Sequence, residues 1–153
     1  MKTPQDRLRA MREVAVRADN MHDAARDLGG RAAAGLTRSR RSQVTGLEGT
    51  ANSALKTSDV FDYITLRIAR QRRDEWTQRS WGPDLLTYLS VKLAGERDAI
   101  CAALKIEQPS IEAVEVHLML VREFVRQFSA EYEYQCALAA AKQNAGQPQG
   151  GGR

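Results

Sequence analysis

The sequence predicts an all-α fold, an antiparallel bundle of five to six helices that includes one long C-terminal helix. Three observations predict it. Aromatic residues make up only 6% of the 153 residues and proline occurs four times, whereas Ala, Leu, Arg and Glu, which favour helix, are abundant. Apolar residues recur at spacings of three and four along most of the chain. The third observation is length: residues 1–143 suffice for a single helical domain with one core.

The first two helices are expected on either side of a small-residue connection. Thr3 fits an N-cap, with Pro4 at the first helical position. The apolar stripe of this helix comprises Leu8, Met11, Val14, Ala18, Met21, Ala25 and Leu28. We expect Gly29-Gly30 to end the helix, residues 31–37 to form the connection, and Thr37 to cap a second helix. The stripe of that second helix is thin and consists of Val44, Leu47, Ala51 and Leu55.

We expect Ser58 or Asp59 to cap the start of a third helix that reaches about Gln78. Pro83, in the sequence SWGPD, then begins a fourth helix, which Gly95 would divide from a short helix that follows it.

The strongest pattern predicts one long helix over residues 109–142. Its apolar residues follow a 3,4 alternation over four heptads and comprise Ile111, Val114, Leu118, Val121, Val125, Phe128, Tyr132, Cys136 and Ala139. Residues 144–153 contain Gly, Gln and Pro with no apolar side chain beyond Ala, so we expect a disordered tail there.

Charge is distributed unevenly along the chain. Residues 31–80 hold ten Lys and Arg against five Asp and Glu, whereas residues 81–153 hold seven against nine. Eighteen of the 23 cations are Arg, whose planar fork suits phosphate, although a compositional bias of the genome would give the same excess. The chain has neither an apolar run that could cross a bilayer nor the apolar segment of a signal peptide. We therefore expect a cytoplasmic protein without membrane contact.

The sequence gives no indication of a catalytic or metal site. His22 and His117 are its two histidines, and His117 lies 19 residues from Cys136 on one predicted helix, about 28 Å away, too far to share a metal. The acidic pairs lie off the apolar stripes, and no P-loop, GxSxG or HExxH motif occurs. We expect no enzymatic activity, no cofactor and no metal, and we interpret Cys101 and Cys136 as reduced core thiols.

The segment Leu36–Gln43 places three arginines at the start of the second predicted helix, namely Arg38, Arg40 and Arg41. The free N–H groups and the dipole already make a helix start electropositive, so cations are unfavourable there unless an anion lies nearby. Phosphate is the anion that we expect, and these three arginines are candidate nucleic-acid ligands.

The third predicted helix also carries basic residues on one side. At 100° per residue, Tyr63, Arg67 and Arg70 fall within about 60° of one another, opposite the apolar arc, with Arg73 at the edge. Arginines neutralise phosphates, and a ring can stack on a sugar or base, so these four are candidate nucleic-acid ligands. An ordinary solvated face would show the same pattern.

Arg122 and Arg126 flank the heptad seam of the long C-terminal helix. They are candidates to extend the basic surface. The competing interpretation, which we favour, pairs them with nearby glutamates as coiled-coil flanks do.

The order of these features resembles the small helical subunit of type III CRISPR effector complexes. In that family a leader helix is followed by a helix that opens with Leu-Thr-x-Ser and basic residues, as in Leu36-Thr37-Arg38-Ser39. A basic and apolar helix similar to LRIARQRR at Leu66–Arg73 comes next. A helix rich in Phe, Ala and Tyr, like FVRQFSAEYEY at Phe124–Tyr134, ends the pattern.

The resemblance implies a non-catalytic scaffold. Several copies would stack along a guide RNA and its target, bind the RNA backbone independently of sequence, and contact other subunits of the complex, including copies of itself. Two other functions remain open: a helical protein-interaction adaptor that binds no nucleic acid, and a stand-alone DNA-binding domain of helix-turn-helix type.

Overall fold

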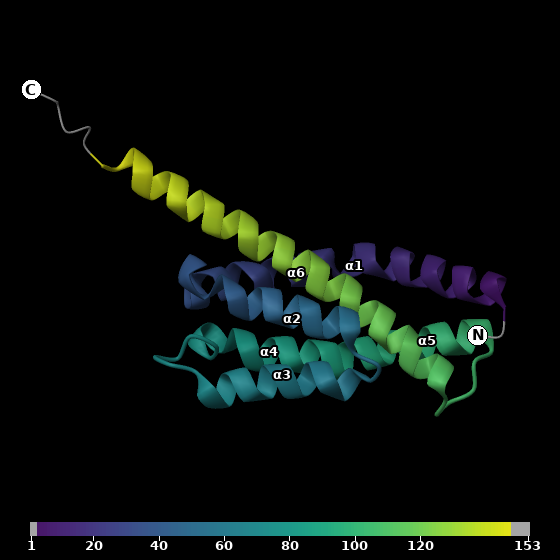
Figure 1. The fold of residues 1–153 in the computed structure, drawn as a ribbon. Coiled ribbons are helices and arrows are strands. Elements are labelled where there is room, and N and C mark those ends of the chain that lie inside the picture. The colour runs from purple at the N-terminus through teal and green to yellow at the C-terminus, as the bar shows by residue number, and fades with distance from the viewer. Residues whose placement is uncertain (1–2, 148–153) are drawn as a thin grey trace, which may run out of the picture.

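The computed structural model describes residues 3–147, and over this range the chain is helical and contains no strand (Figure 1). The α-helices are α1 (Pro4–Leu36), α2 (Arg41–Ser53), α3 (Thr57–Arg70), α4 (Trp81–Thr87), α5 (Leu93–Leu104) and α6 (Ile111–Ala145). Two 3₁₀ turns, η1 (Arg38–Arg40) and η2 (Gln78–Ser80), and one π-helical segment, η3 (Tyr88–Lys92), complete the order. The all-α class and the long C-terminal helix are confirmed.

The longest helix, α6, packs against α1, α2, α3 and α5 and supplies much of the core. Ser110 caps its start, because the Ser110 hydroxyl accepts a hydrogen bond from the N–H of Ala113 at 3.1 Å. The predicted seam residues Leu118, Val121, Val125, Phe128, Tyr132 and Cys136 are all buried. The helix runs without a break to Ala145, so Asn144 and Ala145 are helical rather than part of the expected tail. Gly146 and Gln147 follow the helix without helical structure, and residues 148–153 of the expected tail lie outside the described residues.

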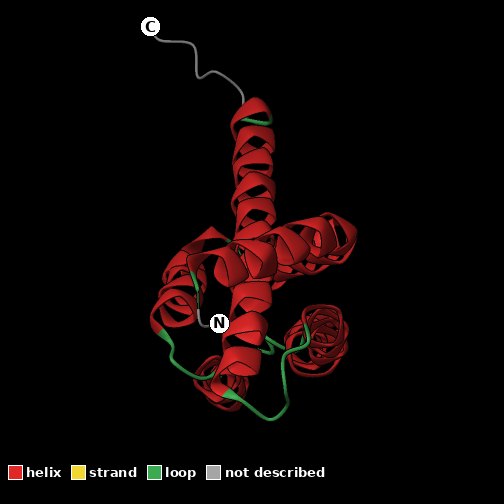
Figure 2. Cartoon of the chain, turned by 90° about the vertical axis from the view of Figure 1, so that its right-hand side faces the viewer, coloured by secondary structure: helices red, strands yellow, loops and turns green. Residues whose placement is uncertain are grey.

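The last turns of α6 extend beyond the other helices (Figures 1 and 2). The side chains there are largely exposed, as are the ends of the predicted stripes. Ile111, the first residue of α6, is 82% exposed, and Leu55, which follows the end of α2, is 88% exposed. The stripe of α1 likewise starts at Ala10, and Leu8 and Met11 face solvent.

The prediction that Gly29-Gly30 ends the first helix is wrong, since α1 continues to Leu36. Gly29 instead permits close packing of α1 on α6: a Cβ at this position would lie 2.6 Å from the backbone oxygen of Phe128. The stripe also continues beyond the glycines, because Ala32 and Leu36 are buried. A glycine that terminates a helix and one that allows close packing look alike in sequence.

Thr37 ends α1 instead of capping α2. Its φ is 56°, and its N–H donates to the oxygen of Ala33 at 3.1 Å. The hydroxyl of Tyr132 in α6 donates to the Thr37 carbonyl, which holds this turn against the core. The N-terminus of α2 has no side-chain cap and no acidic residue in its first turn.

The chain also departs from the prediction between the third and fifth helices. α3 ends at Arg70, well before Gln78, because residues 71–80 form a structured loop. Gly95 does not divide the following helix; the irregularity is the π-helical segment η3. The buried ring of His117 lies beside that segment, with Nε2 at 2.9 Å from the Leu89 carbonyl. His117 is thus a buried residue of the core, while His22 is exposed.

Candidate nucleic-acid interface

The loop of residues 71–80 between α3 and α4 is held together by its own polar side chains. The side-chain oxygen of Gln71 accepts hydrogen bonds from the N–H of Trp76 at 2.8 Å and from the N–H of Thr77 at 3.1 Å. The rings of Trp76 and Trp81 are buried and stack with centroids 4.4 Å apart. The loop is therefore anchored in the core, although several of its side chains, those of Arg72, Arg73 and Asp74 among them, are exposed.

Both tryptophans also tie the loop to its neighbours. The indole N–H of Trp76 donates to the side chain of Gln43 in α2 at 2.7 Å, and that of Trp81 donates to the Glu75 carbonyl at 2.7 Å. Gly35 of α1 lies against the same carbonyl, since a Cβ there would be 2.5 Å from it. These contacts bring the end of α1, the start of α2 and the loop to one end of the bundle.

The tip of the loop has an unfavourable backbone conformation. Arg73 and Asp74 have φ values of 56° and 58°, which cost L-residues about 1–2 kcal/mol each. Positive φ at both central residues is the signature of a type I′ turn, which usually contains Asn or Gly. The turn is closed by a hydrogen bond from Glu75 N–H to the Arg72 carbonyl at 3.4 Å. This conformation displays Arg72 and Arg73 as exposed neighbours.

Five arginines meet around this loop, and we call them the arginine cluster: Arg40, Arg67, Arg70, Arg72 and Arg73. They line two adjoining recesses of about 250 and 410 Å³. Arg40, Arg72 and Glu75 border both recesses, and Glu75 is the only acidic residue that lines either. The recesses therefore carry a strong excess of positive charge.

Tyr63 belongs to the scaffold of the cluster. Its hydroxyl donates to the Gln43 carbonyl at 2.6 Å, and its ring end fills the space beside Gly46, where a Cβ would lie 2.5 Å from the hydroxyl oxygen. The guanidinium carbon of Arg67 lies 5.2 Å from the centre of the Tyr63 ring, within cation–π range. The ring thus positions Arg67 and fastens α3 to α2, while its hydroxyl and one face are occupied within the protein.

Two of the three arginines at the start of α2 have carboxylate partners within the chain. Arg40 Nε donates to Glu75 Oε2 at 2.8 Å, and Arg41 Nε donates to Glu133 Oε1 of α6 at 2.5 Å. The hydrogen bond that Arg41 donates to Glu133 raises the pKa of Arg41. Arg38 is exposed beside Cys136 of α6, outside both recesses of the cluster. Carboxylates of the same chain therefore neutralise two of the three cations at this helix start.

Arg122 and Arg126 lie apart from the cluster, in a groove between α1 and α6. The Arg122 guanidinium donates to the carbonyls of Ala51 at 2.9 Å and Ala54 at 3.0 Å. It therefore caps the C-terminus of α2, a structural role that the sequence did not indicate. Arg126 pairs with Glu123 at 2.8 Å, as expected of a coiled-coil flank.

Sequence reasoning named four of the five arginines of the cluster as candidates and did not name Arg72. The signal was present, because Arg72 and Arg73 adjoin in the segment RQRRDEW. The acidic residue Glu75 was overlooked as well, since its approach to Arg40 depends on the tertiary fold.

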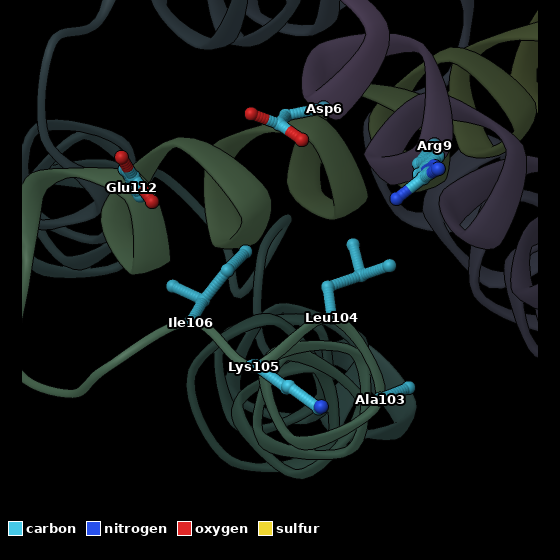
Figure 3. Close-up of a pocket in the computed structure, with 7 residues that line it drawn as sticks. All are labelled: Asp6, Arg9, Ala103, Leu104, Lys105, Ile106 and Glu112. Carbon is cyan, nitrogen blue, oxygen red and sulfur yellow. The ribbon is translucent and has the colours of Figure 1, made fainter. Parts of the chain in front are cut away.

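The opposite end of the bundle has a cleft of about 450 Å³ (Figure 3). Asp6 and Arg9 of α1, Lys105 after α5 and Glu112 of α6 surround it (Figure 3). Its two acids and two bases balance, so it lacks the positive excess that a phosphate chain requires.

Two further observations concern the described residues. Within 3–147, no His, Cys, Asp or Glu side chains form a group of three or more that could hold a metal ion. Over the same range, no helix combines the length and apolar character needed to cross a membrane. Cys101 and Cys136 are buried free thiols, as predicted.

Comparisons with protein-family models, with curated proteins and with solved structures find no match to this chain. The resemblance drawn from the sequence therefore stays a prediction.

Proposed function

We propose that the arginine cluster binds the phosphate backbone of RNA. The observation that carries this proposal is the convergence of five arginines on two adjoining recesses that one carboxylate borders. Two of them, Arg72 and Arg73, lie on a loop that the core fixes in an unfavourable conformation. Glu75 and the Tyr63 ring hold Arg40 and Arg67 in place, but like charges gathered in one region repel one another. A polyanion would offset that repulsion.

Binding of this kind is independent of sequence. The residues that line the two recesses include no aromatic side chain that could stack on a base. Guanidinium groups instead contact phosphate oxygens, which are the same at every nucleotide.

The wider proposal is that the protein is a non-catalytic small subunit of a type III CRISPR effector complex in the cytoplasm, bound to guide and target RNA. Two segments that carry the resemblance, Leu36–Ser39 and Leu66–Arg73, are distant in sequence and meet at the cluster. That meeting supports a shared role in RNA binding. The projecting end of α6 would contact neighbouring subunits or further copies of the chain, since Tyr134 and Leu138 are exposed there.

The same exposed end of α6 favours a second function, that of a helical protein-interaction adaptor. Such a protein would bind its partner through apolar contacts and would be insensitive to salt. The helix-turn-helix alternative has less support. Residues 54–56 make a short connection between α2 and α3, but these helices lie side by side and antiparallel (Figure 1) rather than crossing steeply.

The test measures RNA affinity over a series of salt concentrations. Two unrelated 20-nucleotide RNAs should bind equally well, and Arg67→Ala or Arg70→Ala should weaken both to the same extent. Each lost phosphate contact should lower the slope of log affinity against log salt by about 0.7. Arg12→Ala is the matched control, because Arg12 is exposed on α1, outside the recesses of the cluster.

Wild-type affinity that ignores salt would contradict the proposal and leave the adaptor ahead. Equal losses in the Arg12 variant would show that overall charge, rather than the cluster, binds the RNA.

A further inference from the structure

Glu75 lies where the proposed function would place an anion. Its Oε2 atom accepts the Nε–H of Arg40 at 2.8 Å, and its Oε1 atom accepts the backbone N–H of Arg72 at 3.3 Å. The side chain is only 16% exposed. The carboxylate therefore sits among the arginines, at the border shared by both recesses.

The two donors that hold Glu75 are also suitable phosphate ligands. A phosphodiester, like a carboxylate, presents two oxygens of shared negative charge, and guanidinium and backbone N–H groups bind both classes of anion. A phosphate bound at the position of the carboxylate would need the same two hydrogen atoms, because Arg40 Nε and the Arg72 amide carry one each. The Nη groups of Arg40 carry further hydrogen atoms, but a phosphate bound to them would lie beside the negative charge of Glu75, which would repel it.

The contact is replaceable because only the end of Glu75 takes part in it. The backbone of Glu75 is fixed independently: its N–H bonds to the Arg72 carbonyl, and its carbonyl accepts the indole N–H of Trp81. The Arg40 side chain is 39% exposed, so incoming RNA can reach it. The carboxylate can leave without opening the loop.

We propose that Glu75 is a built-in competitor for phosphate at Arg40, which RNA displaces when it binds. This inference rests on the proposed function and adds regulation to it. In the free protein Glu75 neutralises part of the cluster, and in the bound state a phosphate replaces it. The competition weakens RNA binding, so that the protein releases and rebinds RNA more readily than an unopposed cluster of five arginines would.

The opposite role for Glu75 would be to orient Arg40 toward RNA. The two roles predict opposite effects of Glu75→Gln. This change keeps the size of the side chain and an oxygen for the Arg72 amide, but it removes the charge. If Glu75 competes with phosphate, Glu75→Gln should tighten RNA binding. If Glu75 orients Arg40 toward RNA, the same change should weaken it.

The test compares wild type, Glu75→Gln and Glu123→Gln for binding of a 20-nucleotide polyuridine RNA over a salt series. Glu123 is the matched control, because it pairs with Arg126 at the same 2.8 Å but lies away from the cluster. We expect Glu75→Gln to bind about two- to fivefold more tightly at low salt, the range of a partly exposed ion pair. Its salt slope should steepen by up to about 0.7, as for one added phosphate contact. Glu123→Gln should match wild type.

A second measurement uses the wild-type chain and needs no variant to fold. The NMR signal of the Arg40 Nε–H reports its bond to Glu75 and should shift on saturation with RNA, because phosphate replaces the carboxylate.

The outcomes separate the two proposals. If wild type binds RNA while Glu75→Gln binds equally or more weakly, or if the Arg40 signal stays unchanged at saturation, the competitor role is overturned and the proposed function stands. If neither wild type nor Glu75→Gln binds RNA at any salt concentration, both are overturned.

Discussion

Replacing Arg73 by glycine should stabilise the protein and weaken RNA binding at the same time. Arg73 has a φ of 56°, and relief of the left-handed conformation is worth about 1–2 kcal/mol. Glycine also lowers the free energy of unfolding by about 0.5–1 kcal/mol, because it makes the unfolded chain more flexible. The net gain in the free energy of unfolding is therefore up to about 1.5 kcal/mol. For a chain of 153 residues that raises Tm by up to about 6 °C.

RNA binding should change in the other direction. Arg73 lines one of the two recesses of the cluster, so its loss removes a guanidinium and lowers the salt slope by up to about 0.7. Arg73→Ala is the matched variant, because it removes the same charge but keeps the Cβ that opposes positive φ. Both variants should bind RNA equally weakly, and only the glycine variant should melt higher than wild type. Thermal denaturation by circular dichroism and fluorescence anisotropy with labelled RNA measure the two effects.

Two results would refute this reasoning. If both variants bind RNA like wild type, the charge at Arg73 belongs to an ordinary solvated face. If the glycine variant melts at or below the temperature of the alanine variant, the turn is not strained at this position.

Three further predictions concern the scaffold. Gly29→Ala should lower the free energy of unfolding by about 1–3 kcal/mol, because its Cβ would collide with the backbone of α6. Gly30→Ala, whose Cβ meets nothing within 4 Å, should instead raise the free energy of unfolding by up to about 1 kcal/mol. Equal Tm values for the two variants would contradict the packing role of Gly29. Arg122→Met should lower the free energy of unfolding in urea by about 1–3 kcal/mol, because the carbonyls at the end of α2 lose their donors. RNA affinity should stay unchanged. A weaker affinity would show that Arg122 takes part in RNA binding. Burial, more than the charge of Arg97, lowers the pKa of His117 below its ordinary value near 6.5, while the Leu89 carbonyl and Asp98 oppose the shift. The unfolded chain therefore binds the extra proton first, and stability should fall as pH drops below about 6.5; the test is urea unfolding between pH 5 and 8, and His117→Gln should remove this part of the slope.

The fold class could be predicted because it follows from local periodicity. Four heptads after Pro109 specify a long apolar seam whatever the seam packs against, and this helix came out almost as predicted. The errors occurred where a residue's role depends on a distant partner. Gly29 was interpreted as a helix end, since only the position of α6 shows why a Cβ is absent there. Arg122 was a candidate ligand because its sequence neighbours say nothing of Ala51, 71 residues earlier.

The candidate interface likewise has parts that could be predicted from the sequence and parts that could not. Arg67 and Arg70 share a helix face, so their proximity could be predicted from 100° per residue. Their approach to Arg40 and Arg72 could not, because it depends on the loop that Gln71 and the two tryptophans form. The charge at the start of α2 raised the question of an anion. Phosphate was expected there, but without the fold Glu75 and Glu133 could not be named as the carboxylates that meet two of these arginines.

The position of the tryptophans bears on the free-energy cost of the RNA binding that we propose for the cluster. Ordering flexible arginines on binding costs about 0.5–1.5 kcal/mol for each immobilised side chain, and ordering a loop costs more. Here the backbone of the loop is already ordered, because Trp76 and Trp81 stack in the core and Trp81 continues the stack to Phe128 of α6 at 6.0 Å. The loop backbone therefore needs no further ordering when RNA binds. The burial of the two large rings offsets the free-energy cost of the strained turn. A surface of arginines on a mobile loop would hold the same charge and bind RNA more weakly.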